Sequence, residues 1–226
     1  MPTPKQLYVS TPKTIIPDLP RFTFEGRIEV IQSESEAIRA VRALKGAPLL
    51  GIDTETRPSF RKGEKHKVGL LQVSDRDICF LFRLNMLGFA PCLVELLSDP
   101  AITKVGLSLR DDFMMLRGRR SFTPGGCIDL QEMAKLFGIE DMSLQKLFAN
   151  IFGQRISKTA QLSNWEADTL TQSQKVYAAT DASVCLDLFA ELTRLKASGQ
   201  YALIPEPVKE DVPLPDCDAN EKEAMA

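Results

Sequence analysis

The sequence predicts an α/β protein with a mixed central sheet. Short apolar runs of strand length come first and follow one another closely, as in an antiparallel meander. Later apolar runs are separated by segments of helical character, which favours parallel pairing with helices covering the sheet. A chain of 226 residues, 44% of them hydrophobic, can bury such a core within one domain.

Five strands and six helices are expected. The strands are predicted at 27–32, 48–53, 67–74, 77–83 and 103–108. The third and fourth strands flank Ser74-Asp75-Arg76-Asp77, which is typical of a hairpin turn. A capping box formed by Ser33 and Glu36 opens the first helix. The helices are predicted at 33–45, 89–98, 109–117, 129–137, 143–151 and 171–197.

Proline marks both ends of the chain. Nine of the 14 prolines lie at residues 2–20 and 205–215, where they fix φ and remove backbone donors. We therefore expect an extended N-terminal arm over residues 1–24, one domain over 25–200, and an acidic, disordered tail over 201–226.

Composition excludes several classes of protein. The formal net charge of −2 does not suit a strongly basic nucleic-acid coat protein, so any contact with nucleic acid must use a local basic patch or bound metal. Five scattered cysteines and one histidine predict no zinc site. No run approaches the roughly 18 apolar residues of a membrane span. The polar, proline-rich N-terminus does not resemble a signal peptide, so we expect a cytoplasmic protein without membrane contact.

An acidic pair ends the predicted strand at 48–53. Asp53 and Glu55 are two residues apart, so on a strand their side chains share a face. Two carboxylates at one spot repel each other unless a cation lies between them, and Mg²⁺ or Mn²⁺ prefers such oxygen ligands. Alone, the pair is equally compatible with a strand that ends in a polar loop.

Two further segments carry acids in comparable positions. Asp111 and Asp112 begin a helix after the strand at 103–108, where acids also simply offset the helix dipole. They face different directions, so at most one can join a site. Tyr177 and Asp181 share a face of the last helix at i and i+4. A core tyrosine whose hydroxyl meets Asp181 would explain that pair as well.

Taken together, these motifs resemble the 3′–5′ exonuclease superfamily with four catalytic acids (DEDD), in its tyrosine-bearing branch. The order and spacing of Asp53, Glu55, Asp112, Tyr177 and Asp181 carry the resemblance, with Asp111 as the alternative second-motif acid. The segments Leu162-Ser163-Asn164-Trp165 and Tyr177-Ala178-Ala179-Thr180-Asp181 are similar to Werner-type exonuclease domains, and ribonuclease D-type domains are also similar. The resemblance covers about residues 27–196 and implies a ribonuclease H-like fold with a five-stranded mixed sheet.

The resemblance also implies a mechanism. Asp53, Glu55, Asp112 and Asp181 would hold two divalent ions, Mg²⁺ or Mn²⁺, about 3.5–4 Å apart, for in-line hydrolysis of a phosphodiester at a free 3′ end of DNA or RNA. Nucleoside 5′-monophosphates would be released. Tyr177 would orient the water, because a phenol with a pKa near 10 is a poor base at neutral pH. The single histidine, His66, is expected to be an exposed loop residue.

Substrate contacts are less defined by the sequence. A basic stretch over 57–67 follows the acidic pair and could hold phosphates, or it could be a solvated loop. Trp165 is expected to anchor the core. Gln161 and Met114 depart from residues that relatives often carry. A catalytically silent binding module and an endonuclease of the same fold are the competing hypotheses. The candidate substrate-binding residues are Thr54, Arg57, Lys62 and Lys158.

Overall fold

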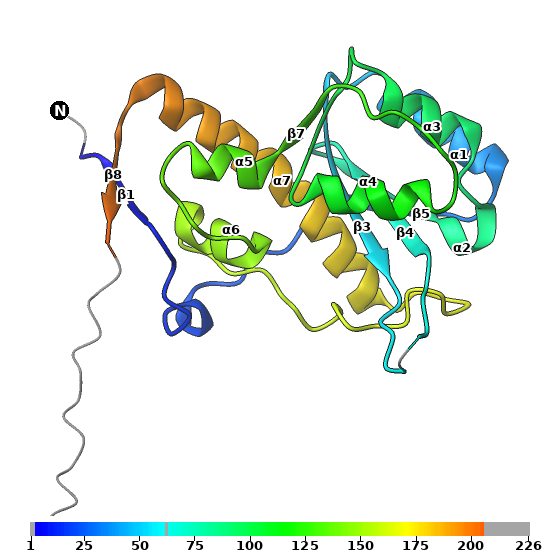
Figure 1. The fold of residues 1–226 in the computed structure, drawn as a ribbon, viewed down its shortest axis with the longest axis horizontal. Coiled ribbons are helices and arrows are strands. Elements are labelled where there is room, and N and C mark those ends of the chain that lie inside the picture. Colours follow the sequence, from blue (N-terminus) through cyan, green and yellow to red (C-terminus); the bar gives the residue numbers. More distant parts are fainter. Residues whose placement is uncertain (1–2, 62, 206–226) are drawn as a thin grey trace, which may run out of the picture.

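A six-stranded mixed sheet forms the centre of the computed structural model, which describes residues 3–61 and 63–205 (Figure 1). Its strand order is β2-β5-β4-β3-β6-β7. The predicted meander is confirmed, because β3, β4 and β5 pair antiparallel, whereas β2, β6 and β7 are added by parallel pairing. The strands are β2 (Arg27–Ile31), β3 (Leu49–Thr56), β4 (Val68–Ser74), β5 (Ile78–Arg83), β6 (Thr103–Gly106) and β7 (Cys127–Asp129).

The sixth strand corrects the expected five. β7 has only three residues and pairs with β6, with Gly106 opposite Asp129. Three residues are too few for an alternating pattern to stand out in the sequence. The helix predicted to begin at 129 in fact begins at Leu130, and Asp129 is its N-cap.

Helices cover both faces of the sheet. One core joins α1, α3 and α4 to Leu50 and Ile52 of β3, and another joins α5, α6 and α7 on the opposite face. The predicted capping box of Ser33 and Glu36 is present at α1. The helices are η1 (Ile16–Asp18), α1 (Glu34–Leu44), α2 (Leu84–Leu87), α3 (Pro91–Ser98), α4 (Leu109–Arg117), α5 (Leu130–Lys135), α6 (Leu144–Phe152) and α7 (Gln172–Ser198).

Gly51 lets α7 cross β3 at very short range. A Cβ atom built on Gly51 would lie 2.0 Å from the carbonyl oxygen of Ala182, so any larger residue would push the helix away. Ala178, Ala179 and Ala182 keep the adjoining helix surface thin and are fully buried. The close crossing places the acidic residues of β3 and α7 at the same level of the sheet.

Segments near both ends of the described chain form a second, two-stranded sheet. β1 (Lys5–Tyr8) pairs parallel with β8 (Tyr201–Ile204). The expected tail over 201–226 therefore begins with a strand that the sequence did not reveal, because parallel pairing of distant segments leaves no local signal. The rest of that tail, residues 206–226, lies outside the described residues.

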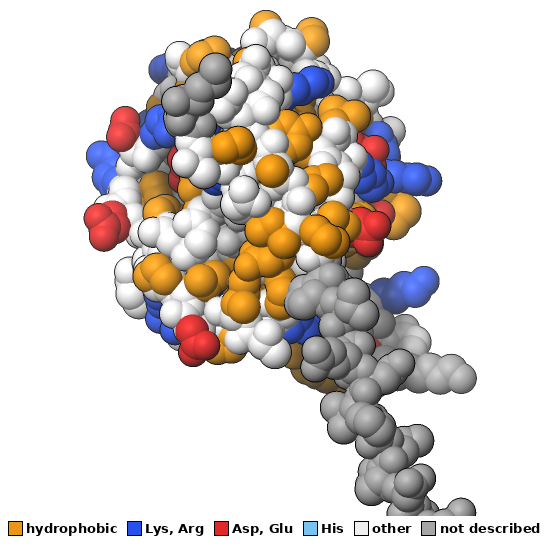
Figure 2. All heavy atoms as spheres, turned by 90° about the vertical axis from the view of Figure 1, so that its left-hand side faces the viewer, with side chains coloured by type: hydrophobic (Ala, Val, Ile, Leu, Met, Phe, Trp, Pro, Cys, Tyr) orange, Lys and Arg blue, Asp and Glu red, His pale blue; other side chains and the backbone are white. Residues whose placement is uncertain are grey.

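In the arm that follows β1, residues 13–18 form a turn and the short η1, and hydrogen bonds from backbone amides hold the arm to the domain. The Phe22 amide donates to the Arg155 carbonyl, and the Phe24 amide donates to the Thr180 hydroxyl beside Asp181. On the face that carries β1 and β8, hydrophobic side chains form a patch with charged side chains around it (Figure 2). Within the described ranges, no helix is both long and apolar enough to cross a membrane.

Candidate metal centre

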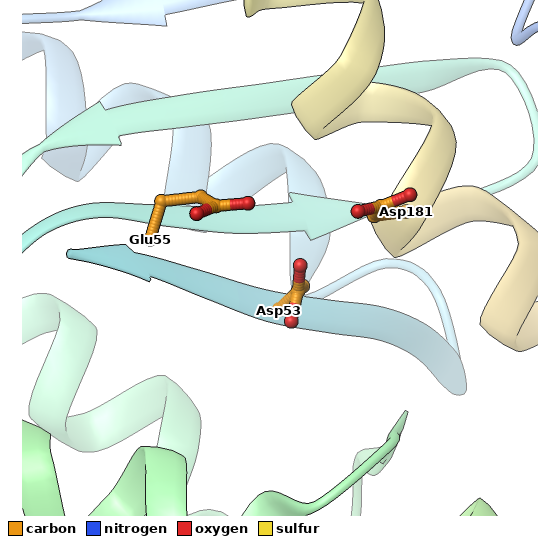
Figure 3. A group of neighbouring side chains, drawn as sticks. All are labelled: Asp53, Glu55 and Asp181. Atoms are coloured by element: carbon orange, nitrogen blue, oxygen red, sulfur yellow. The ribbon is translucent and has the colours of Figure 1, made fainter. Parts of the chain in front are cut away.

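Three carboxylates converge where β3 passes under α7. Asp53 and Glu55 project from the same face of β3, and Asp181 projects from α7 toward them (Figure 3). One oxygen from each lies within 4.8 Å of the others. The structure thus brings together three of the four acids that the sequence singled out, in the spacing of a site that could hold a cation.

The local sequence fixes these positions. The antiparallel register places Asp53 opposite Gln72 of β4, and the alternation of the strand then puts Glu55 on the same face. α7 begins at a capping box in which the Thr171 hydroxyl accepts from the Gln174 amide. Asp181 follows on the side of α7 that crosses Gly51.

Burial and mutual repulsion make this cluster costly when its members are charged. Burial and the neighbouring acids Asp112, Asp181 and Glu55 raise the pKa of Asp53 well above its usual value. Burial, followed by the charges of Asp181 and Asp112, raises the pKa of Glu55 to about 9. Burial raises the pKa of Asp181 to about 7, and hydrogen bonding to Tyr177 and the charge of Lys158 oppose that rise. A bound cation would relieve these costs.

The fourth acid approaches from the other side of β3. Asp112, in the first turn of α4, accepts a 2.6 Å hydrogen bond from the Thr54 hydroxyl. Burial raises the pKa of Asp112 to about 7, the Thr54 hydroxyl opposes the rise, and Asp129 and Asp111 add to it. Asp112 lies outside the tight group of three, but its charge raises the pKa values of Asp53 and Glu55. Asp111 is exposed.

Asp129 is a residue of the site region that sequence reasoning missed. Its carboxylate accepts from the amides of Ser108 at 3.1 Å and Leu109 at 2.8 Å, at the start of α4, as well as from the Gln131 amide at 2.9 Å. Ser108 has a φ of 61°, the left-handed conformation that a non-glycine residue adopts only when its surroundings hold it. Asp129 therefore fixes the turn from which Asp112 projects.

Tyr177 lies one helical turn from Asp181 and remains a phenol. Burial, followed by the charges of Asp181 and Glu55, raises its pKa far above the usual value. Its ring lies 6.0 Å from that of Trp165, centroid to centroid. Trp165 is fully buried, so the predicted core role is confirmed. The Tyr177 hydroxyl can donate or accept hydrogen bonds beside Asp181 but cannot act as a base near neutral pH.

The acidic cluster opens into a cavity of about 300 Å³. Asp53, Glu55, Tyr177 and Asp181 line one side of it, and the far side comes from α6 and the segment that follows. Lys158, on that far side, is exposed, and its positive charge lowers the pKa of Asp181. The lining residues on the far side include Ser143, Leu144, Gln145, Ser157, Lys158 and Gln161.

The predicted substrate-binding residues are divided among several places. Lys158 lines the cavity, whereas the Thr54 hydroxyl is engaged by Asp112. The Arg57 guanidinium lies 3.7 Å from the Glu166 carboxylate, and Lys62 lies outside the described residues. The expected exposure of His66 is wrong: its side chain is 13% exposed, because Glu64 and Glu166 enclose the imidazole at 3.1 and 3.5 Å.

The sequence of the chain matches a family model described as 3′–5′ exonuclease over residues 28–196. It is 34% identical over 194 residues to exonuclease 3′–5′ domain-containing protein 2 of Mus musculus, a match that covers 76% of this chain and 30% of the relative. It is 28% identical over 177 residues to the bifunctional 3′–5′ exonuclease/ATP-dependent helicase WRN of Mus musculus, covering 76% and 13%. The chain thus spans less than a third of either relative.

Solved structures share the fold. The crystal structure of Escherichia coli RNase D, described as an exoribonuclease involved in structured RNA processing, superposes with a TM-score of 0.69 at 24% sequence identity. The superposition covers 76% of this chain and 46% of that protein. The sheet and helices described above therefore have the arrangement of this exonuclease fold.

Proposed function

Because the chain belongs to the 3′–5′ exonuclease family, we propose that it hydrolyses phosphodiester bonds at the 3′ ends of DNA or RNA with the help of divalent metal ions. The observation that carries the proposal is a group of three carboxylates, the half-buried Asp53 and the buried Glu55 and Asp181, each with an oxygen within 4.8 Å of the others. Repulsion between these carboxylates destabilises the folded protein unless a ligand relieves it. Each cycle would release one nucleoside 5′-monophosphate.

The donor set fits magnesium or manganese ions. All candidate ligands are carboxylate oxygens, which these hard cations prefer over nitrogen or sulfur. Among the described residues, Asp181 Oδ1 is buried and has no hydrogen-bond partner. We propose that Asp53, Glu55, Asp112 and Asp181 would hold two such ions. Bound metal ions would lower the pKa of a coordinated water and stabilise the charge on the departing 3′-oxygen.

The other residues would act on the water and on the strand end. The Tyr177 hydroxyl, kept protonated by its raised pKa, would hold the attacking water in line with the scissile bond. Glu55 would accept a hydrogen bond from the terminal 3′-hydroxyl, which would favour chain ends over internal sites. Lys158, at the rim of the same cavity, would contact a phosphate oxygen.

Digestion of labelled single strands tests this proposal. DNA and RNA strands of matched sequence, with either a 3′-hydroxyl or a 3′-phosphate, are incubated with the protein and Mg²⁺ or Mn²⁺. We expect stepwise shortening that needs a free 3′-hydroxyl and stops on addition of a chelator. Cutting of a closed circle would indicate an endonuclease, and binding without digestion would indicate a silent module.

Asp112→Asn and Asp111→Asn form a matched pair on one helical turn. Both remove a single negative charge from the start of α4, but Asp112 is half-buried beside Thr54 and Asp111 is exposed. We expect Asp112→Asn to lose most of the activity and Asp111→Asn to keep it. If Asp111→Asn instead loses the activity and Asp112→Asn keeps it, the fourth metal ligand is Asp111.

A further inference from the structure

A second cavity lies beside the metal centre. It has a volume of about 390 Å³, and the N-terminal arm forms one of its walls through Lys13, Ile16 and Pro17. Ser143, Gln145 and Lys158 line both cavities, so the two share a wall. The other lining residues are Lys146 and Arg155.

The charge of this second cavity is opposite to that of the first. Lys13, Lys146, Arg155 and Lys158 line it, and the described lining residues include no acid. Lys13 and Lys158 are exposed, whereas Lys146 also contacts the buried Asp141 carboxylate at 3.3 Å. α6 begins at this wall, and its first turn carries no acidic residue, so the positive end of the helix dipole adds to the field.

The arm is held in place at this wall. Arg155 donates from its backbone amide to the Pro20 carbonyl and from Nε to the Leu19 carbonyl, both at 2.9 Å. The Thr11 amide donates to the Asp141 carboxylate at 3.0 Å. Lys13 lies between these two attachments. It also lies outside residues 28–196, the part of the chain that matches the exonuclease family model.

We propose that this second cavity binds the sugar-phosphate backbone of the strand whose 3′ end occupies the metal centre. The inference rests on the proposed function and extends it. A polyanion that enters an acidic metal site needs compensating positive charge along its path, and here that charge begins at the shared residue Lys158 and continues to Lys13. The exposed side chain of Pro17 offers an apolar surface for a sugar or a base.

Charge reversal at Lys13 tests the inference. Lys13→Glu changes an exposed loop side chain whose ammonium makes no ion pair within the described residues, so folding should be preserved. Lys196→Glu, at the exposed end of α7, is the matched control. Binding is measured by fluorescence anisotropy with a single strand of about 12 nucleotides whose 3′-terminal linkage is a phosphorothioate, in Ca²⁺. Cleavage of the same sequence with normal linkages, and of a dinucleotide, is measured in Mg²⁺.

We expect Lys13→Glu to weaken binding of the longer strand about tenfold and to reduce the slope of log affinity against log salt by about 0.7. Lys196→Glu should match the unmodified protein. The loss of cleavage should be larger for the longer strand than for the dinucleotide. Unchanged binding and salt slope in Lys13→Glu, with cleavage intact, would overturn this inference alone. An unmodified protein that binds the strand but cleaves neither substrate would contradict the proposed function instead.

Discussion

Asp141 and Asp181 are both almost fully buried, 1% and 6% exposed, but their surroundings differ. The Asp141 carboxylate accepts hydrogen bonds from the Thr11 amide and hydroxyl, from the Asn150 side-chain amide and from the Lys146 ammonium. Asp181 has one buried oxygen that meets no donor within the described ranges. Its nearest neighbours include other carboxylates.

The difference separates an acid that stabilises the fold from one that is kept for a ligand. Burying a carboxylate costs several kcal/mol unless hydrogen bonds and an opposite charge replace its hydration. At Asp141 both are supplied by the arm and by α6. In the cluster of Asp53, Glu55 and Asp181 little of this is supplied by the chain, so the cost is removed by protonation or by a cation.

The largest expected effect is the loss of catalysis in Asp53→Asn. Removal of this proposed metal ligand should reduce the rate by about 10³-fold or more, since metal ions contribute several kcal/mol and each ~1.4 kcal/mol is a factor of ten. The metal-free variant should nevertheless melt at a higher temperature than the unmodified protein, because one member of a repulsive buried cluster is neutral. Single-turnover cleavage and thermal unfolding check the two effects. An Asp53→Asn variant that is inactive and also less stable than the unmodified protein would contradict the proposed difference between the acidic cluster and Asp141.

Asp141→Ala should show the opposite behaviour. Removal of the carboxylate leaves the Lys146 charge and the Thr11 amide without their partner, which should lower the free energy of unfolding by about 3 kcal/mol. The melting temperature should fall by about 2–4 °C for each kcal/mol. Glu140→Ala is the matched control, because its side chain is exposed next to Asp141. Unfolding in urea provides the measurement, and equal stability of both variants would refute the proposed role of Asp141.

The stability of the metal-free protein should fall as the pH rises from about 4 to 9. Folding raises the pKa of Asp112 and Asp181 to about 7 and that of Glu55 to about 9. The folded state therefore binds more protons than the unfolded state in this window, and stability is lost as these groups ionise. The loss should amount to several kcal/mol, because each of these pKa shifts exceeds two units and one unit corresponds to ~1.4 kcal/mol.

Added Mg²⁺ or Mn²⁺ should reverse that fall, most strongly at the alkaline end, where the ligands are ionised. A metal concentration of about 100 times the dissociation constant adds roughly 2.7 kcal/mol. Thermal unfolding with and without metal, at several pH values, gives both curves. If the curves of stability against pH run parallel for the unmodified protein and Asp53→Asn, the result would argue against the proposal that these acids interact as one cluster.

Sequence reasoning located the acids but not all of what positions them. The position of Asp53 and Glu55 on one strand face and the meander were both predicted, because each depends on a pattern that repeats within a short stretch of sequence. β7 was missed because three residues carry no pattern, and Asp129 was absorbed into a predicted helix for the same reason.

Contacts between distant segments were also beyond the sequence. β1 and β8 pair across almost the whole described chain, and the basic cavity combines Lys13 of the arm with residues beyond 140. β1 and β8 have only four residues each, and Lys13 lies between Pro12 and Pro17, so no local pattern indicates the pairing of these strands or the position of Lys13. Their positions depend on α6 and α7, which bring the arm and the metal centre together in space (Figure 1).

Thr54→Val should give the smallest effect. It tests Asp112, whose surroundings are intermediate between those of Asp141 and those of Asp181. Asp112 has one donor in the Thr54 hydroxyl, at 2.6 Å, whereas Asp141 has several. That hydrogen bond lowers the pKa of Asp112 against the effect of burial. Loss of the hydroxyl should therefore raise the pKa of Asp112 further and weaken metal binding about tenfold, as for other residues that hold metal ligands through hydrogen bonds.

Thr54→Ser keeps the hydroxyl and is the matched control. The rate of cleavage is measured against Mn²⁺ concentration and pH, so that a change in metal affinity is separated from a change in substrate affinity. In Thr54→Val the metal requirement should rise, and the acidic limb of the pH profile should move to higher pH because Asp112 holds its proton more tightly. A higher KM for the strand with unchanged metal and pH dependence would instead support the predicted substrate contact of Thr54. It would also group Asp112 with acids such as Asp181, whose charge is stabilised by a metal ion rather than by a hydrogen bond from the chain.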